Sequence, residues 1–202
     1  MQLIVITRPD FFPRETELVN SLFEQGLQRL HLRKPDATPE DMERWLQQIE
    51  PCFRRSIALH DHHALVDKWL LGGIHLNARN PQPPETWDAN KGVLLSRSCH
   101  SLDELRTLSQ DCAYAFLSPI FNSISKQGYA AQFSLEQLKG VQEEMPFFDK
   151  VFALGGVTPE RVPALQETGF RGVAVLGDIW QHPNPVERMK EYLHLCNKSC
   201  SD

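Results

Sequence analysis

Residues 150–177, KVFALGGVTPERVPALQETGFRGVAVLG, contain two apolar runs, a helix-period segment between them and a glycine turn after each run. Strands are predicted at Lys150–Leu154 and Gly172–Leu176, and a helix at Pro159–Glu167. Thr158 precedes the proline and supplies a capping hydroxyl for this helix. A strand, a helix and a second strand in this order predict a βαβ unit with parallel strands.

The same alternation runs through the rest of the chain. Six more apolar runs predict strands at Leu3–Thr7, Leu30–Arg33, Ser56–His60, Gly73–Asn77, Gly92–Ser96 and Tyr114–Ser118. Helix-period segments lie between most of them, at Glu15–Gln25, Pro39–Ile49, Ala64–Leu71, Leu102–Ser109, Leu135–Glu144 and Val186–Leu195. The fourth unit differs, because the prolines in Asn80–Asn90 leave no room for a full helix.

Eight units of this kind predict a single (β/α)8 TIM barrel with a degenerate fourth helix, formed by residues 1–202 as one domain. The rival is an open, doubly wound sheet. The first strand is not followed by the Gly-x-Gly-x-x-Gly turn of dinucleotide-binding sheets, and this favours the closed barrel.

The bulk composition excludes several classes of protein. The 202 residues are 41% hydrophobic and 23% charged, and the formal net charge of −5 disfavours nucleic acid and anionic membranes as partners. No apolar run approaches the roughly 20 residues of a membrane span, and the first one lacks the basic flank of a signal peptide. We therefore expect a cytoplasmic protein whose five cysteines are reduced thiols.

Polar residues follow most of the predicted strands, and active sites of such barrels lie at the carboxyl ends of the strands. Those ends carry Arg33, Lys34, His60, Asp61, Asn77, Arg79, Asn80, Ser98 and His100. Gly155, Gly156 and Gly177 follow the last two strands, where backbone N–H groups and a short helix could bind a phosphate. The alternative is that these glycines only turn the chain.

The run His60-Asp61-His62-His63 raises the question of a metal site. Consecutive residues that leave a strand point in different directions, so the whole run cannot ligate one ion. Asp61 is the better candidate, for a hard cation such as Mg²⁺ that binds carboxylates and substrate phosphates. The polar loop Asn122–Phe133 either closes over a substrate, bringing Lys126 onto a phosphate, or is merely solvated.

Seven segments, in register along the chain, resemble motifs of the thiamine phosphate synthase family and its barrel relative, the thiazole tautomerase. They are LHLRK at 30–34, HD at 60–61, GIHL at 73–76, SCHS at 98–101, SPIFNSISK at 118–126, ALGGVT at 153–158 and GVAV at 172–175. The resemblance implies a transferase of thiamine biosynthesis. Such a synthase joins a hydroxymethylpyrimidine diphosphate to a thiazole phosphate and releases pyrophosphate.

The resemblance also implies roles for individual residues. The diphosphate would be held by Arg33, Ser98 and Lys126, and Mg²⁺ by Asp61 with Asn80 at the second metal position. The thiazole side would be held by Ser123 and Ser125 and the thiazole phosphate by Gly156 and Gly177, with Gly155 beside the substrate. His31 is a further candidate catalytic residue, and Lys34 and His60 are expected beside the substrate.

The sequence departs from the family pattern at several of these positions. Asn80 stands where the family has a second acidic metal ligand, and losing that charge should weaken Mg²⁺ binding unless substrate oxygens compensate. His31 and His60 replace a glutamine and an asparagine. The family's lysine position in the first motif aligns with Pro35, so Lys34 is one place early.

Two other functions remain open. One is a metal-independent thiazole tautomerase: its Arg-Ser-x-His-Ser pattern fits residues 97–101, but its proton-moving histidine aligns with Pro119. His31 or His60 would then have to transfer the proton. The other is a catalytically silent barrel that binds a thiamine precursor or a partner protein. Small barrels often pair, so a homodimer is an expectation that the sequence does not decide.

Overall fold

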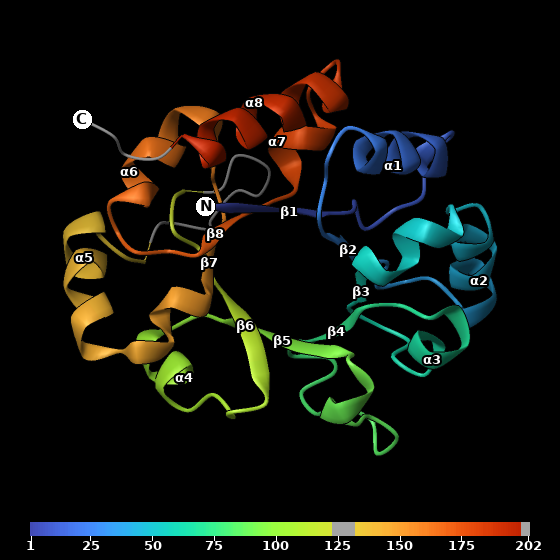
Figure 1. Ribbon diagram of the computed structural model, residues 1–202, viewed down its shortest axis with the longest axis horizontal. Coiled ribbons are helices and arrows are strands. Elements are labelled where there is room, and N and C mark those ends of the chain that lie inside the picture. The colour runs from blue at the N-terminus through green and yellow to red at the C-terminus, as the bar shows by residue number, and fades with distance from the viewer. Residues whose placement is uncertain (123–131, 199–202) are drawn as a thin grey trace.

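Eight parallel strands pair in chain order and close into a barrel, because the first strand also pairs with the last. The structure is a computed structural model that describes residues 1–122 and 132–198. Figure 1 looks along the barrel, with the strands as an inner ring and the helices around it. The strands are β1 (Gln2–Ile6), β2 (Leu30–Leu32), β3 (Ile57–Leu59), β4 (Gly73–Leu76), β5 (Leu94–Cys99), β6 (Cys112–Leu117), β7 (Val151–Leu154) and β8 (Gly172–Val175). The predicted closed barrel is confirmed, and the open sheet is excluded.

The helices pack on the outside of this ring. They are α1 (Glu15–Glu24), α2 (Pro39–Gln47), α3 (Leu65–Trp69), α4 (Leu102–Arg106), α5 (Leu135–Glu144), α6 (Val162–Gln166), α7 (Gly177–Trp180) and α8 (Pro185–Asn197). Local chemistry fixes where they begin. At the start of α2, the Thr38 hydroxyl accepts a hydrogen bond from the Asp41 amide, and the Asp41 carboxylate accepts one from the Thr38 amide.

The fourth unit is degenerate, as predicted. Every residue between β4 and β5 is described, and this segment contains no α-helix, only a 3₁₀ turn at Ala89–Lys91. The strand after it is predicted at Gly92–Ser96 but lies at Leu94–Cys99. Gly92 has a φ of +71° and ends the 3₁₀ turn in the left-handed region, so it cannot continue into a strand.

The pair of β1 and β8 closes the barrel between segments that are far apart in the chain. The paired residues run from Gln2 with Gly172 to Val5 with Val175. A Cβ added at Gly172 would lie 2.1 Å from the Gln2 carbonyl oxygen, so the two strands approach this closely only because residue 172 is glycine.

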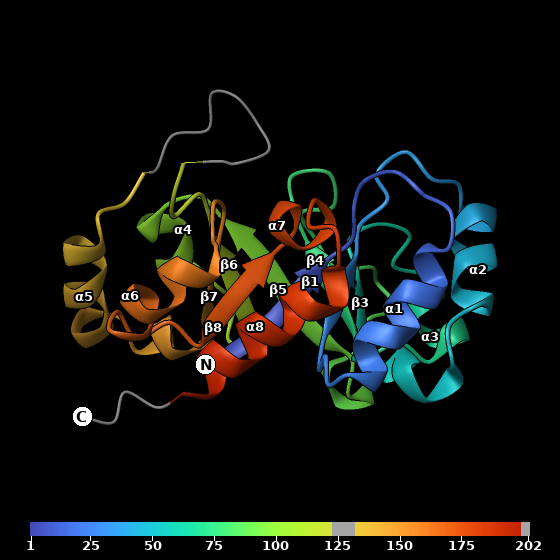
Figure 2. The ribbon, with the colours of Figure 1, turned by 90° about the horizontal axis from the view of Figure 1, so that it is seen from above.

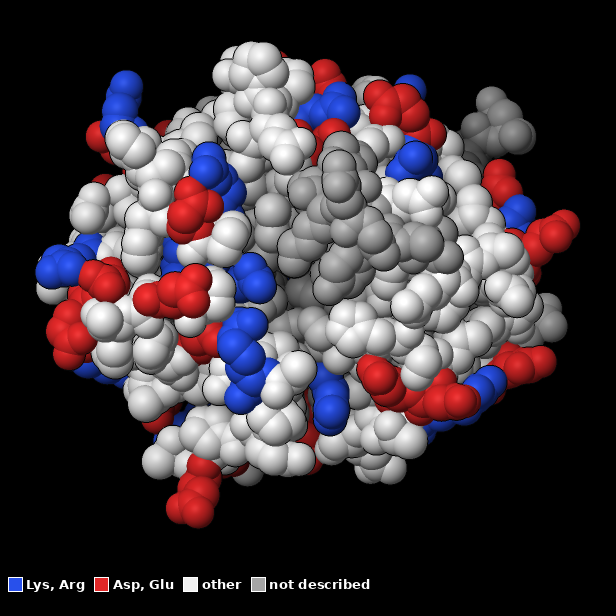
Figure 3. All heavy atoms as spheres, turned by 180° about the vertical axis from the view of Figure 1, so that it is seen from behind, with Lys and Arg blue, Asp and Glu red and all other residues white. Residues whose placement is uncertain are grey.

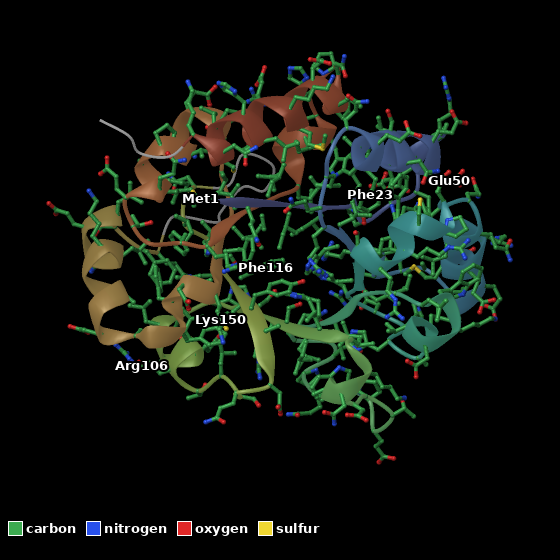
Figure 4. All side chains as sticks on the ribbon, viewed as in Figure 1. Met1, Phe23, Glu50, Arg106, Phe116 and Lys150 are labelled. Carbon is green, nitrogen blue, oxygen red and sulfur yellow. The ribbon has the colours of Figure 1, made fainter. Side chains whose placement is uncertain are left out.

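Apolar side chains form two separate layers. The larger layer lies between the strands and the helices, and the smaller one fills the inside of the ring. Figure 4 shows Phe116 in that interior. The inner layer consists of Ile4, Ile6, Tyr114, Phe116, Phe152 and Ala174. All of these come from β1, β6, β7 and β8, so only one side of the interior is apolar.

The opposite side of the interior is polar. His31 in β2, His75 in β4 and Ser96 in β5 are fully buried there, and His60 directly after β3 is 4% exposed. Because buried polar groups are costly unless they are hydrogen-bonded, this half of the barrel must satisfy them internally.

Two bulk expectations concern the environment of the protein. In the part of the chain that the structure describes, no helix is long and apolar enough to cross a membrane. Cys52, Cys99, Cys112 and Cys196 are free thiols, as expected, and Cys200 lies outside the described residues.

Candidate active site

The strands end on one face of the barrel. Figure 2 shows their arrows pointing to the side on which α7 lies, and Figure 3 shows that side directly. Lys and Arg side chains gather near the middle of this face. The polar residues that the sequence places at the carboxyl ends of β2, β3, β4 and β5 belong to it.

Three buried histidines form the floor beneath this face. His31 Nδ1 lies 2.9 Å from His60 Nε2, and the His60 ring stacks on the ring of His75 with centroids 4.2 Å apart. His31 Nε2 also lies 2.7 Å from the hydroxyl of Tyr114 on β6. Burial, reinforced by neighbouring positive groups, lowers the pKa of His31 and His60 well below the usual range, and burial lowers the pKa of His75 to about 3. The floor is therefore polar but uncharged at neutral pH.

The three histidines are close enough to be considered as metal ligands, since one ring nitrogen of each lies within 4.8 Å of the others. A neutral imidazole has only one free lone pair. Both ring nitrogens of His31 are hydrogen-bonded, and those of His75 lie 2.9 and 2.8 Å from the hydroxyls of Ser96 and Ser98. Because these partners already use the lone pairs of His31 and His75, we assign no metal to the cluster.

A fall in pH is expected to destabilise the fold through these histidines. The unfolded chain binds a proton at each histidine as the pH falls below about 6.5, whereas the native state does not, so the free energy of unfolding decreases as pH falls. Over the two pH units around 6.5, each histidine is expected to remove about 1.4 kcal/mol of stability in total, and the slope approaches that value per pH unit only below this range. Urea unfolding between about pH 7.5 and 5.5 measures it. His31→Gln should reduce the slope, and a wild-type stability that is flat over this range would contradict the prediction.

The residues at the predicted metal position already form a closed cluster. Asp61 is paired with the guanidinium of Arg79: Arg79 Nε and Nη2 lie 3.1 and 3.0 Å from Oδ1, and Nη2 lies 3.1 Å from Oδ2. Asn80 donates through Nδ2 to Asp61 Oδ1 at 3.0 Å and to the His60 carbonyl at 2.9 Å. The Asp61 side chain is 10% exposed and that of Arg79 is 45% exposed.

A tight turn after β4 holds this cluster in place. The backbones of Asn77 and Asn80 exchange two hydrogen bonds of 3.1 Å. The Asn77 side chain accepts from the amides of Arg79 and Asn80 and donates to the His60 carbonyl. Arg79 is therefore positioned by its own backbone as well as by Asp61. From the sequence, Arg79 is expected at a strand end but has no predicted role. Its partner Asp61 lies in a different turn, after β3, so no local pattern indicates the pair.

Arg33 and Lys34 follow β2 but have opposite surroundings. Arg33 is half-buried, and its guanidinium makes no ion pair with any residue in the described ranges. Partial burial and the positive charge of Arg79 lower the pKa of Arg33, and the carboxylates of Asp61 and Asp36 offset only part of this effect, so the guanidinium of Arg79 lies close enough to repel that of Arg33. A cation without a partner beside a second cation favours the binding of an anion.

The expectation that Lys34 binds substrate needs correction. Lys34 is fully buried, and its ammonium donates to both carboxylate oxygens of Glu15, at 2.7 and 2.9 Å, and to the Asp10 carbonyl at 2.7 Å. All three of its donors are used. Consecutive residues after a strand point in opposite directions, so Arg33 reaches the face and Lys34 turns toward α1.

Ser98 lies at the edge of the histidine floor. It is half-buried on β5, and its hydroxyl lies 2.8 Å from His75 Nε2. His75 in turn contacts Ser96, whose hydroxyl donates to the Ile74 carbonyl at 3.1 Å. The floor therefore fixes the position of the Ser98 oxygen, whose hydrogen would have to turn away from His75 to reach an acceptor on a ligand.

Gly155 and Gly156, directly after β7, contact the turn that follows β6. The amide of Phe121 donates to the Gly155 carbonyl at 3.0 Å, and Arg161 donates to the Gly156 carbonyl while its guanidinium lies 4.7 Å from the centre of the Phe121 ring. Gly155 and Gly156 have φ values of +94° and +63°. Both are half-exposed, so this turn contributes backbone groups to the face.

Gly156→Ala is expected to destabilise the protein. A Cβ there would lie 2.3 Å from the carbonyl oxygen of Asn122, in a left-handed conformation that already costs about 1–3 kcal/mol for other residues. The midpoint of thermal unfolding measures the loss. Gly140→Ala is the control, because nothing lies within 4 Å of a Cβ at that position. Equal stability of the two variants would contradict the prediction.

The turn after β8 leads into the short helix α7. Gly177 is the first residue of this helix and is half-exposed. Asp178 faces α8, where it pairs with Arg188 at 2.7 Å and accepts from the Tyr192 hydroxyl at 2.8 Å. These bonds fix α7 against α8 and leave the Gly177 turn on the face. Lys126, Ser123 and Ser125 lie outside the described residues.

Comparison with known proteins agrees with this geometry. The family model described as thiamine monophosphate synthase matches residues 3–179. The chain belongs to this family.

Curated relatives and solved structures give the same result. A thiamine-phosphate synthase of Bacteroides fragilis is 27% identical over 187 residues, which cover 89% of this chain and 92% of the relative. One from an Enterobacter species is 31% identical over 171 residues, covering 81% and 79%. The crystal structure of thiamine phosphate pyrophosphorylase from Bacteroides thetaiotaomicron has a TM-score of 0.86 and 35% identity, covering 98% of each chain. A Pyrococcus furiosus structure, at 20% identity and a TM-score of 0.76 over 96% and 95%, shares the barrel fold.

Proposed function

We propose that this member of the thiamine monophosphate synthase family joins hydroxymethylpyrimidine diphosphate to thiazole phosphate, giving thiamine phosphate and pyrophosphate. The observation that carries the proposal is the half-buried guanidinium of Arg33, which has no ion-pair partner among the described residues and lies within electrostatic reach of Arg79. A guanidinium without an ion-pair partner can donate two parallel hydrogen bonds to the oxygens of a diphosphate. The names of the similar proteins support the same activity.

The reaction asks for binding more than for covalent chemistry. The bond between the pyrimidine methylene carbon and the diphosphate oxygen breaks, and its electron pair leaves with pyrophosphate. The lone pair of the thiazole nitrogen then forms the new bond to that carbon. In this proposal Arg33 and Ser98 bind the diphosphate, and Arg33 meets the negative charge that grows on it.

The second substrate would bind through its phosphate at the turns after β7 and β8. Gly155, Gly156 and Gly177 offer backbone there without side chains in the way. Lys126, Ser123 and Ser125 complete the proposed set from outside the described residues. His31 and His60 would form the polar floor beneath the substrates.

Mg²⁺, which the family resemblance implies, does not fit the residues as they are arranged. Mg²⁺ prefers oxygen ligands in octahedral geometry. Asp61 is already paired through both oxygens with Arg79, and Asn80 directs its NH₂ group, not its oxygen, at Asp61. The orientation of this amide is fixed, because its nitrogen faces two acceptors. We therefore derive no step through a metal.

The thiazole tautomerase remains a less favoured alternative. His31 is fully buried, and both of its ring nitrogens are hydrogen-bonded within the barrel, so it is poorly placed to exchange a proton with a substrate. A homodimer and a cytoplasmic location stay predictions.

Turnover of the purified protein with both substrates tests the proposal. The products, thiamine phosphate and pyrophosphate, are separated by chromatography after reaction in Mg²⁺ and, separately, in EDTA. Product in either condition supports the synthase activity. No product in both, with thiazole phosphate still bound, would overturn it in favour of a silent barrel.

A further inference from the structure

We propose that Arg79 takes the place of a divalent cation in this protein, so that two guanidinium groups, Arg79 and Arg33, bind the substrate diphosphate without a metal. This inference rests on the proposed function for the identity of the diphosphate. It starts from the ion pair between Arg79 and Asp61, which uses the carboxylate that the sequence predicts as the metal ligand.

The formal charges support the replacement. A divalent cation held by two carboxylates has a formal charge of zero, and so has one guanidinium held by one carboxylate. Relative to the family pattern, Asn80 in place of an acidic residue removes one negative charge. Arg79 in place of a divalent ion removes one positive charge. The diphosphate therefore meets the same local charge in both arrangements.

The geometry of Arg79 leaves room for a ligand. Asp61 occupies Nε and one side of Nη2, whereas Nη1 makes no hydrogen bond within residues 1–122 and 132–198. The side chain is 45% exposed. A guanidinium has five N–H donors in a planar fork, so the edge away from Asp61 can hold two phosphate oxygens side by side.

The position of Arg79 is fixed before any ligand binds. Asp61 is nearly buried and accepts from Asn80 as well as from Arg79, and the Asn77 side chain accepts from the Arg79 amide. A cation that is held in place by the fold needs little reorganisation when the substrate arrives. In a metal site, the coordinating carboxylates do the same for the ion.

Arg33 supplies the second charge. Its pKa is lowered by partial burial and by Arg79, so the two cations disfavour each other in the free protein. A bound diphosphate relieves that repulsion. When the carbon–oxygen bond breaks, both groups donate hydrogen bonds to the departing pyrophosphate and neither needs to transfer a proton.

Binding of inorganic pyrophosphate, measured by calorimetry on the full chain, tests the inference independently of turnover. The wild-type protein should bind it in EDTA with an affinity within about threefold of that in Mg²⁺. Arg79→Ala should weaken binding in EDTA by about tenfold or more, since hydrogen bonds between charged groups are among the strongest. Arg44→Ala is the matched control, because it removes an arginine from an exposed ion pair on α2.

A double variant provides the converse test. Arg79→Ala with Asn80→Asp frees Asp61 and restores a second carboxylate, so its pyrophosphate binding should be weak in EDTA and recover at least about tenfold with Mg²⁺. If Arg79→Ala does not fold, Arg79→Gln is used, because it keeps a donor for Asp61 and removes the charge.

The outcomes separate this inference from the proposed function. Arg79-dependent binding of pyrophosphate in EDTA supports the inference even if the two substrates are not joined. The inference is overturned if wild-type binding requires Mg²⁺, or if Arg79→Ala binds like the wild type in EDTA. In that case Mg²⁺-dependent turnover would still support the synthase.

Discussion

Arg33→Ala is expected to lower turnover of the two substrates by about 100-fold or more, the usual cost of removing one donor aimed at a charge that grows during the reaction. The guanidinium is half-buried and has no ion-pair partner among the described residues. The same change should leave the free energy of unfolding nearly unchanged, because the Arg33 guanidinium makes no ion pair with the described residues. Steady-state kinetics and urea unfolding measure the two quantities.

Arg33→Lys provides the control for charge alone. Lysine keeps the positive charge but loses the fork of donors, so we expect activity between that of the wild type and that of Arg33→Ala. If Arg33→Ala loses stability and activity together, Arg33 holds the fold and the proposed role is wrong.

Lys34→Met is expected to destabilise the protein by about 3–5 kcal/mol, because it leaves the buried carboxylate of Glu15 without its cation. The Lys34 side chain is 0% exposed and that of Glu15 is 2% exposed. Burial lowers the pKa of Lys34 and raises the pKa of Glu15, so each charge depends on its partner. Since small domains are stable by only about 5–15 kcal/mol, much of the stability would be lost. Urea unfolding measures it.

A double variant distinguishes the pair from the packing around it. Lys34→Met with Glu15→Leu removes both charges and should recover most of the loss. Recovery will be incomplete, because the indole N–H of Trp45 donates to Glu15 at 3.0 Å and would lose its acceptor. A loss of less than about 1 kcal/mol in Lys34→Met alone would mean that the ion pair contributes little.

The sequence predicts the barrel well, because each strand and helix carries its own local signal. The apolar runs, the helix caps and the prolines after β4 specify eight units without reference to distant residues. The exact strand ends are predicted less well: β5 begins two residues later than predicted, because Gly92 adopts a left-handed conformation, and β6 begins two residues earlier, at Cys112.

The site is predicted less completely, because its residues act through partners far along the chain. Arg79 is held in the site by Asp61, which lies 18 residues earlier in the chain. Lys34 points away from the face because its ammonium binds Glu15, 19 residues earlier. Neither pairing has a spacing that a pattern could reveal. His31 and His60 appear in sequence as departures from a motif, whereas the barrel brings them together as hydrogen-bonded partners.

The pairing of β1 with β8 has a consequence for synthesis on the ribosome. Gln2 is made 170 residues before its partner Gly172. Until then the outer edge of β1 has unpaired N–H and C=O groups, which can pair with another nascent chain. A contact of such long range also closes slowly. Translation that pauses shortly before residue 172 should therefore yield more aggregated chains than a pause after release of β8.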